Sequence, residues 1–314
     1  MITVVGEALV DLIQRRGADT YNAEPGGSPY NVAIGLARLG IPVTLTAGAG
    51  PDQFGQRLRR HAEDNGVDLS RWVASKRPTT LAIASVDESG QASYGFYLDA
   101  TAGLDWRADD LVASVPDRGV LHIGSIASWY PPAGQAVLAL QAQVHAAGIC
   151  LISYDPNVRP ALLESPGAAA VVVEANVALT HVVKASAEDV EWLYPRASVA
   201  EAAARWSLLG PALVVITSGG DGATAYAGGG QILARPAFPI SVVDTVGAGD
   251  AFTAGLLAGL AERRVTSAEQ LRDGLRSDEL DLAAVLDYAT TTAGLTCQRA
   301  GADPPTRAEV LAAR

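Results

Sequence analysis

The chain has 314 residues, of which 49% are hydrophobic and 18% charged, and its formal net charge is −11. This length and apolar content indicate one large domain, or a domain with a small appendage, rather than a string of modules. The acidic balance argues against nucleic acid as a partner, because basic patches bind phosphate backbones. No uncharged apolar run reaches the roughly 18 residues of a membrane span.

Cysteine and histidine usage indicates a reducing compartment without a structural metal. Cys150 and Cys297 lie in apolar surroundings, where a buried reduced thiol is the ordinary state. The four histidines show no metal-ligand spacing. The start of the chain, MITVVGEALVDL, lacks the basic region of a signal peptide, so we expect a cytoplasmic location.

Short apolar runs alternate with segments of helical period along most of the chain. The expected buried strands are residues 2–6, 42–47, 119–123, 149–154, 180–184 and 213–217. The helical segments between them include residues 133–147, 167–176 and 199–208. Near-continuous apolar strands separated by helices predict an α/β domain over residues 1–314, with a mostly parallel sheet covered on both faces.

Two segments depart from this pattern. Residues 78–98 alternate polar and apolar side chains around an Asp-Glu-Ser-Gly turn, which is typical of an antiparallel hairpin, and residues 10–24 lack a helical period. We interpret the two as a small β lid from about 12–24 and 72–100. An edge meander without a functional role is the alternative.

A helix is expected from the sequence GGSPYN, residues 26–31, to Leu39. Ser28 suits the N-cap, Pro29 suits the first turn, and Gly40 follows as the stop. A well-capped helix explains these three residues. It does not explain the glycine pair or an asparagine in the first turn.

The segment 241–263 carries the clearest chemical pattern. A strand is expected to end at Asp244, and the glycine turn 247–249 then leads directly into an amphipathic helix with Asp250 at its start. Backbone N–H groups that converge at such a helix start bind anions. A carboxylate beside an anion site suits phosphoryl transfer, because it takes the proton of the attacking hydroxyl. The competing interpretation is that Asp250 is an ordinary helix-start residue.

The string DTVGAGDAF resembles the carboxy-terminal signature of the PfkB, or ribokinase, family of carbohydrate kinases, and GGSPYNVAIGLARLG resembles the family's other signature. GPDQFG matches the family's G-x-D-x-x-G, and four further strings look specifically like fructokinases: TTLAIASVDESGQ, HIGSIAS, ISYDPNVRP and VVKASAEDVEWLYP. The resemblance implies an ATP-dependent sugar kinase with a ribokinase-like three-layer sandwich and a β-sheet lid.

The resemblance also implies roles for individual residues. Asp250 would be the catalytic base, and the anion hole would consist of Gly247, Ala248 and Gly249. The residues implied to bind the sugar are Asp11, Gly26, Gly27, Asn31 and Arg159, the last with a salt bridge to a neighbouring helix as the alternative. The residues implied to bind ATP are Lys184, Ser186, Thr217, Ser218, Gly220 and Gly222.

Metals and partners follow from the same resemblance. Mg²⁺ should be required, because the charge of the triphosphate needs neutralising, and Asp189 would act on it indirectly. A monovalent cation, K⁺, is implied at residues Asp244, Val246, Thr296, Arg299 and Gly301. Family members often dimerise through their lids, and the apolar face of the hairpin permits a homodimer here.

The implied substrate is a furanose-form ketohexose, fructose first, phosphorylated on a primary hydroxyl. 2-Keto-3-deoxygluconate, ribose, tagatose and a nucleoside stay open as alternatives. Leu98 stands where many fructokinases place an arginine of the lid, which leaves the sugar's identity undecided. Thr290 occupies a variable position near the adenine, and Ser186 with Asp189 replaces the family's Asn-x-x-Glu, as fructokinase-like members often do.

Two interpretations from other classes compete with a kinase. Residues 220–225 formally match the dinucleotide fingerprint G-x-G-x-x-G/A, but AYAGGGQILA after them predicts strand and turn, which disfavours an NAD-dependent oxidoreductase. A non-catalytic sugar sensor would have lost Asp250 or its glycine turn, and neither is lost. No Gly-Lys-Ser/Thr and no His-Arg-Asp motif occurs, which excludes P-loop and protein kinases.

Overall fold

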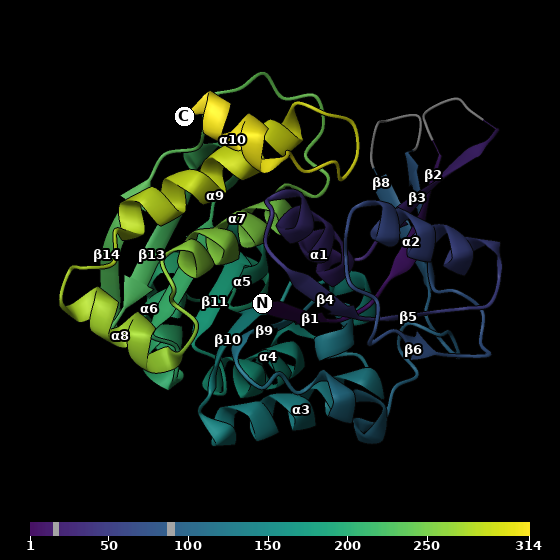
Figure 1. Cartoon of the computed structure of the whole chain (residues 1–314), viewed down its shortest axis with the longest axis horizontal. Coiled ribbons are helices and arrows are strands. Elements are labelled where there is room, and N and C mark those ends of the chain that lie inside the picture. The colour runs from purple at the N-terminus through teal and green to yellow at the C-terminus, as the bar shows by residue number, and fades with distance from the viewer. Residues whose placement is uncertain (15–18, 87–91) are drawn as a thin grey trace.

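A large central sheet runs through the computed structural model, which describes residues 1–14, 19–86 and 92–314 (Figure 1). Its strands lie in the order β14-β13-β12-β11-β10-β9-β1-β4. Their bounds are β1 (Ile2–Val5), β4 (Val43–Thr46), β9 (Gly119–Gly124), β10 (Cys150–Asp155), β11 (Val182–Ser186), β12 (Leu213–Thr217), β13 (Ala223–Ala227) and β14 (Gly230–Arg235). The six strands expected from the sequence are β1, β4 and β9 to β12, and they are mutually parallel. The mostly parallel sheet is thereby confirmed, with β13 and β14 as an antiparallel edge.

The helices of the described residues cover both faces of this sheet. Their bounds are α1 (Ser28–Arg38), α2 (Gln53–Asp64), α3 (Ala133–Ala147), α4 (Pro166–Ala178), α5 (Ala187–Leu193), α6 (Val199–Leu209), α7 (Ala248–Glu262), α8 (Ala268–Arg276), α9 (Leu282–Cys297) and α10 (Arg307–Ala313). Short 3-10 turns are η1 (Ala108–Ser114), η2 (Ile126–Ser128), η3 (Pro160–Leu162) and η4 (Gly219–Asp221). The helices expected between the strands are α3, α4 and α6.

Successive side chains of each strand point to opposite faces of the sheet, and this produces two apolar clusters, one on each face. Val4 and Val5 are neighbours in β1, yet they belong to opposite clusters. Val4 packs in the cluster of α1, α7 and α9, while Val5 packs in that of α3, α4 and α6. Figure 1 shows α7 and α9 on one side of the sheet and α3 and α4 on the other. Helices on both faces explain why the strands are apolar along their whole length.

A second sheet of four strands lies at one side of the body, and we call it the lid sheet. It consists of β2 (Leu9–Gln14), β3 (Tyr21–Gly26), β7 (Leu81–Val86) and β8 (Ala92–Tyr97), in the order β3-β2-β7-β8. β7 and β8 pair antiparallel, which confirms the hairpin, and its Asp-Glu-Ser-Gly turn lies outside the described residues. The chain enters this sheet at Leu9, earlier than the expected residue 12, and a separate pair is formed by β5 (Gly48–Ala49) and β6 (Val73–Ala74).

The prediction of a strand that ends at Asp244 was wrong, because residues 236–247 contain neither strand nor helix. The apolar side chains of this segment stay on the surface, with Val242 62% and Val243 66% exposed. Two prolines in the segment also oppose a strand, because proline cannot donate to a ladder. The N–H groups of Val243 and Asp244 instead donate to the carbonyl of Cys297 at the end of α9.

Both cysteines are free thiols, Cys150 buried and Cys297 half-buried. Among the residues that the structure describes, no helix has the length and apolar character to cross a membrane. The same residues contain no cluster of three or more His, Cys, Asp or Glu side chains placed to hold a metal ion.

Candidate active site

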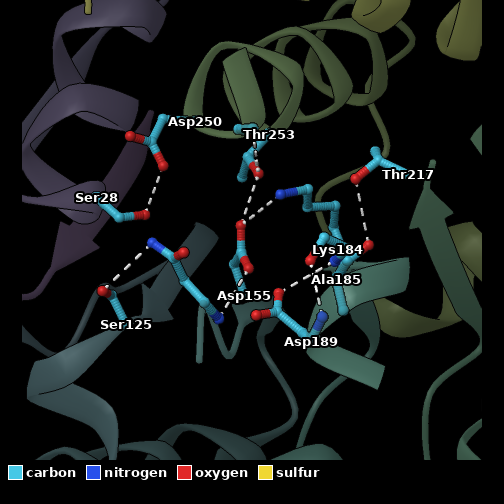
Figure 2. A network of polar contacts seen from close by, with 12 residues as sticks. Ser28, Ser125, Asp155, Lys184, Ala185, Asp189, Thr217, Asp250 and Thr253 are labelled. Atoms are coloured by element: carbon cyan, nitrogen blue, oxygen red, sulfur yellow. Dashed lines mark hydrogen bonds and ion pairs between the residues drawn. The ribbon is translucent and has the colours of Figure 1, made fainter. Parts of the chain in front are cut away.

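Asp250 lies in the first turn of α7, directly after the glycine turn. Gly247 is the N-cap of this helix and has left-handed backbone angles, with φ 76° and ψ −1°. Two side chains of α1 donate to the buried carboxylate: Ser28 Oγ to Oδ1 at 2.6 Å and Asn31 Nδ2 to Oδ2 at 2.8 Å (the first pair is drawn in Figure 2). Burial raises the pKa of Asp250 to about 6 against the effect of these hydrogen bonds, so the group is mainly ionised at pH 7.

The expected N-cap role of Ser28 was wrong. The N-cap of α1 is Gly27, with φ 103° and ψ 126°, and no side chain caps the helix. A Cβ on Gly27 would lie 2.5 Å from the carbonyl oxygen of Glu7, so both the backbone angles and the close approach require glycine. The helix therefore starts one residue earlier than expected, and the hydroxyl of Ser28 is directed to Asp250. Gly40 follows the helix with φ 78°, as predicted for the stop.

Asp11 on β2 lies against the other glycine of the pair. A Cβ on Gly26 would lie 2.0 Å from Asp11 Oδ2, so this glycine leaves room for the carboxylate. Burial raises the pKa of Asp11 to about 6, with Arg159 lowering it and Asp250 raising it further. The structure thus brings these three charged groups within electrostatic reach of one another. Arg159 Nη1 donates to the Val158 carbonyl, and the salt-bridge alternative has no counterpart among the described ion pairs.

A buried ion pair lies beside the glycine turn. Lys184 Nζ is 2.9 Å from Asp155 Oδ2, and the side chains are 6% and 1% exposed. Thr253, one turn after Asp250, donates to the same oxygen at 3.2 Å, and Figure 2 shows dashed lines from Asp155 to both Lys184 and Thr253. Burial lowers the pKa of Lys184, but the Asp155 carboxylate has the opposite effect, and the pKa of Lys184 is raised above its usual range. A Cβ on Gly249 would lie 3.0 Å from Lys184 Nζ, so the ammonium group faces the predicted anion hole.

A cavity of about 810 Å³ opens at the carboxyl ends of β10, β11 and β12. The predicted site residues that line it are Arg159, Lys184, Ser186, Asp189, Thr217, Ser218 and Gly249. Gly220 and Gly222 are not among its lining residues. Gly222 has a backbone reason to be glycine, since its φ is 97° and a Cβ would lie 2.1 Å from the carbonyl oxygen of Arg235. The cavity gathers residues from consecutive strands at the edge where open α/β sheets bind ligands.

Ser186 and Asp189 form a capping box at the start of α5. Asp189 N donates to Ser186 Oγ at 3.0 Å, and Ser186 N donates to Asp189 Oδ2 at 3.2 Å. Asp189 Oδ1 accepts from the N–H of Val158 at 2.9 Å. Burial raises the pKa of Asp189, and the nearby Asp155 adds to the effect. Both oxygens are engaged by backbone N–H groups, so this carboxylate fits contact with Mg²⁺ through water better than direct ligation.

The residues expected around a monovalent cation come from two segments that the structure joins, the loop before α7 and the end of α9 with the residues after it. Asp244 Oδ1 accepts from the N–H of Val246 at 3.1 Å, and its Oδ2 accepts from the N–H of Gly301 at 2.8 Å. Thr296 is buried and donates its hydroxyl within α9, while the Arg299 side chain pairs with acidic neighbours. A carboxylate oxygen is a ligand that hard cations prefer, so the Asp244 side chain fits the expected cation, whose site stays a prediction.

Leu98 and Thr290, two of the positions that depart from the family pattern, are both buried. Leu98 is 4% exposed and packs in the apolar cluster of α3, α4 and α6. Thr290 is 7% exposed on α9, and its hydroxyl donates to the carbonyl of Asp287 at 3.1 Å. Leu98 therefore has a packing role that an arginine in its place would not share.

Three polar residues at the site were not assigned to it from the sequence, namely Ser28, Thr253 and Ser125. Ser28 was read as a cap, and Thr253 had no signal beyond its spacing of three residues from Asp250. Ser125 and Asn157 lie just past the ends of the neighbouring strands β9 and β10, with φ 55° and 39°, and Asn157 Nδ2 donates to Ser125 Oγ at 3.4 Å. Such left-handed angles at non-glycine residues are uncommon and cluster at functional sites.

Comparisons with known proteins agree with this arrangement. A family model described as pfkB family carbohydrate kinase matches residues 1–309. A fructokinase of Rhizobium leguminosarum bv. trifolii is 36% identical over 288 residues, which are 87% of this chain and 86% of the relative. The crystal structure of a fructokinase with bound ATP from Xylella fastidiosa has a TM-score of 0.89 at 29% identity, covering 99% of this chain and 97% of that one.

A double-mutant fructokinase from Vibrio cholerae O395, solved in fructose-, ADP- and potassium-bound form, has a TM-score of 0.84 at 28% identity. That comparison covers 99% of this chain and 97% of the other. The family match over almost the whole chain and the three-layer architecture with its small sheet lead to the same class. The chain belongs to the pfkB family of carbohydrate kinases, phosphotransferases of ribokinase-like fold.

Proposed function

We propose that this sugar kinase transfers the γ-phosphoryl group of ATP to a primary hydroxyl of a ketohexose, with fructose as the first candidate. The observation that carries the proposal is the position of the Asp250 carboxylate, between the starts of α1 and α7 and three residues after Gly247. A relative 36% identical to this chain is a fructokinase, and a solved neighbour holds fructose and ADP. Both support the sugar assignment.

The sugar half of the proposed reaction rests on three side chains. Asp250, ionised at neutral pH, accepts the proton of the attacking hydroxyl as the new O–P bond forms and the bond to ADP breaks. Asp11 would accept from, and Asn31 would donate to, vicinal hydroxyls of the sugar. Asp11 belongs to the lid sheet, so lid position and sugar binding are coupled in this proposal.

The phosphate half uses the start of α7 and the cavity beside it. The N–H group of Gly249 and the ammonium group of Lys184 would stabilise the charge on the transferring phosphoryl group. The N–H group of Ala248 donates to the Thr245 carbonyl at 3.2 Å here and would have to turn to the phosphoryl group to join them. ATP would extend along the cavity at the ends of β10 to β12. Asp189 would hold Mg²⁺ through water, and the ion would neutralise triphosphate charge. K⁺ would bind where Asp244 meets Gly301.

A phosphorylation screen tests the proposal. Fructose, tagatose, ribose, 2-keto-3-deoxygluconate and a nucleoside are each supplied with ATP and Mg²⁺, and NMR identifies the phosphorylated carbon. We expect fructose to give the highest kcat/KM. A tenfold preference for 2-keto-3-deoxygluconate would show that the substrate order is wrong. Omitting K⁺ from a Na⁺-free assay should lower the rate, and equal rates would contradict the cation site.

A homodimer through the lid sheet is a further part of the proposal. β3 and β8 are the outer strands of that sheet, and Tyr21 and Tyr97 on them are 47% and 60% exposed. Unpaired outer strands with exposed aromatic side chains favour association. Light scattering should give twice the monomer mass, and a monomer at all working concentrations would contradict the dimer.

A further inference from the structure

The hydroxyl of Ser28 is used in an unusual way for a serine at a helix start. Such a serine commonly accepts a hydrogen bond from the N–H three residues on, but α1 has no side-chain cap. Ser28 is 7% exposed, and its Oγ donates to Asp250 Oδ1 at 2.6 Å. This distance lies in the range of about 2.5–2.7 Å that is typical of a hydroxyl donating to an ionised carboxylate.

The backbone around Ser28 is fixed relative to Asp250 by close packing. A Cβ on Gly35 of α1 would lie 2.7 Å from Cβ of Ala254 on α7, so the two helices pack through small side chains. At the start of α1, a Cβ on Gly6 would lie 2.1 Å from Cγ of Pro29. The backbones that carry Ser28 and Asp250 therefore cannot shift relative to each other without moving a helix.

We propose that Ser28 is a positioning residue that holds the Asp250 carboxylate in orientation for proton abstraction and stabilises its ionised form. The inference rests on the proposed function, because Asp250 has to be the base. Ser28 occupies Oδ1 and Asn31 occupies Oδ2, and each carboxylate oxygen keeps a second lone pair for the sugar hydroxyl.

The sign of the expected effect follows from the groups that face Asp250. Asp155 on β10 and Asp11 on β2 oppose its ionised form, and Lys184 on β11 favours it. Ser28 and Asn31 on α1 also favour it by donating hydrogen bonds. Removing the Ser28 hydroxyl leaves the buried carboxylate with one donor fewer, so the pKa of Asp250 rises above about 6.

The test compares Ser28→Ala with a matched serine on α6. Ser207 is also 7% exposed, and its hydroxyl donates to the Ala204 carbonyl at 2.7 Å and accepts from Gly229 N at 2.9 Å. We expect Ser28→Ala to move the acidic limb of the kcat/KM profile up by about one pH unit, with a smaller loss at pH 8. Ser207→Ala should leave the limb in place. A limb that is unchanged in Ser28→Ala, or shifted equally in both variants, would overturn the proposal.

A second measurement separates this inference from the proposed function. Titration of the Asp250 carboxyl carbon by ¹³C NMR, assigned with Asp250→Asn, requires neither sugar nor ATP. The midpoint should be higher in Ser28→Ala than in the wild type, and equal midpoints would rule out the role of Ser28. If no sugar is phosphorylated, the proposed function fails, while the titration still decides whether Ser28 stabilises the ionised carboxylate.

Discussion

Two groups of helix starts differ in how their first turn is completed. Most helices begin with a Ser, Thr or Asp side chain that accepts a first-turn N–H, namely α2, α4, α5, α6, α8, α9 and α10. The helices α1 and α7, which meet at Asp250, begin with a glycine of positive φ and no such cap. α3 also lacks a cap, so the left-handed glycine, rather than the missing cap alone, distinguishes the pair.

The difference indicates that α1 and α7 lack the stability that a capping side chain would give and keep N–H groups available for a ligand instead. A capping side chain contributes about 0.5–2 kcal/mol to stability, and it also covers N–H donors that a ligand would otherwise bind. Gly27 and Gly247 bring the chain into α1 and α7 without a side chain over those donors. The helices α1 and α7 therefore meet at the buried carboxylate with first-turn N–H groups that no capping side chain covers, as binding of an anion or a hydroxyl requires.

The largest expected effect comes from removing the charge where these helices meet. Asp250→Asn keeps the shape and an acceptor for Ser28 but removes the base. General-base catalysis typically contributes about 10²–10⁴-fold, so kcat should fall by at least about 10²-fold with ATP affinity little changed. Steady-state kinetics and a melting curve measure both quantities. A turnover within threefold of the wild type would mean that Asp250 is only a helix-start residue.

A smaller loss is expected when a methyl group enters the anion hole. In Gly249→Ala the new Cβ would lie 3.0 Å from Lys184 Nζ, which its pair with Asp155 holds in place. The ammonium group has to shift away from the start of α7, and we expect kcat/KM for ATP to fall about tenfold. Gly167 on α4 is the matched control, because nothing lies within 4 Å of its would-be Cβ. Equal activity of the two alanine variants would show that the close approach has no catalytic value.

The sequence predicted the parts of the molecule whose signals are local. The parallel strands and the helices α3, α4 and α6 followed from apolar period, and Gly40 followed from its place after a helix. The contact of Ser28 with Asp250 joins residues 222 positions apart, so local pattern assigned the serine to capping instead. The prediction of a strand before Asp244 failed for a related reason. Apolar composition does not reveal whether a run of residues is buried or lies on the surface.

Stability should respond to pH through the same carboxylate, in the opposite direction to activity. The pKa of Asp250 is raised from 3.8 to about 6 in the folded state, so ionising it opposes folding. Its protonated form favours the folded state at low pH, and that contribution is lost as pH rises from about 4 to 6. Asp250→Asn never ionises at this position. Its Tm relative to the wild type should therefore increase across that window and stay constant above it, and differential scanning calorimetry at several pH values measures the trend. A difference that falls with rising pH would contradict the raised pKa.

The smallest effect is expected at a capped helix away from Asp250. Ser267 begins α8, where Gln270 N donates to its hydroxyl at 3.2 Å and Ser267 N donates to Gln270 Oε1 at 3.1 Å. Ser267→Ala loses this cap, so the free energy of unfolding should fall by about 1 kcal/mol, measured by chemical denaturation. The kinetic constants and the acidic limb of the pH profile should match the wild type, because the lost acceptor serves only the helix. A Ser267→Ala variant with altered turnover but unchanged stability would contradict this expectation. It would mean that a capped helix start affects the reaction as well, and the distinction between the two groups of helix starts would be lost.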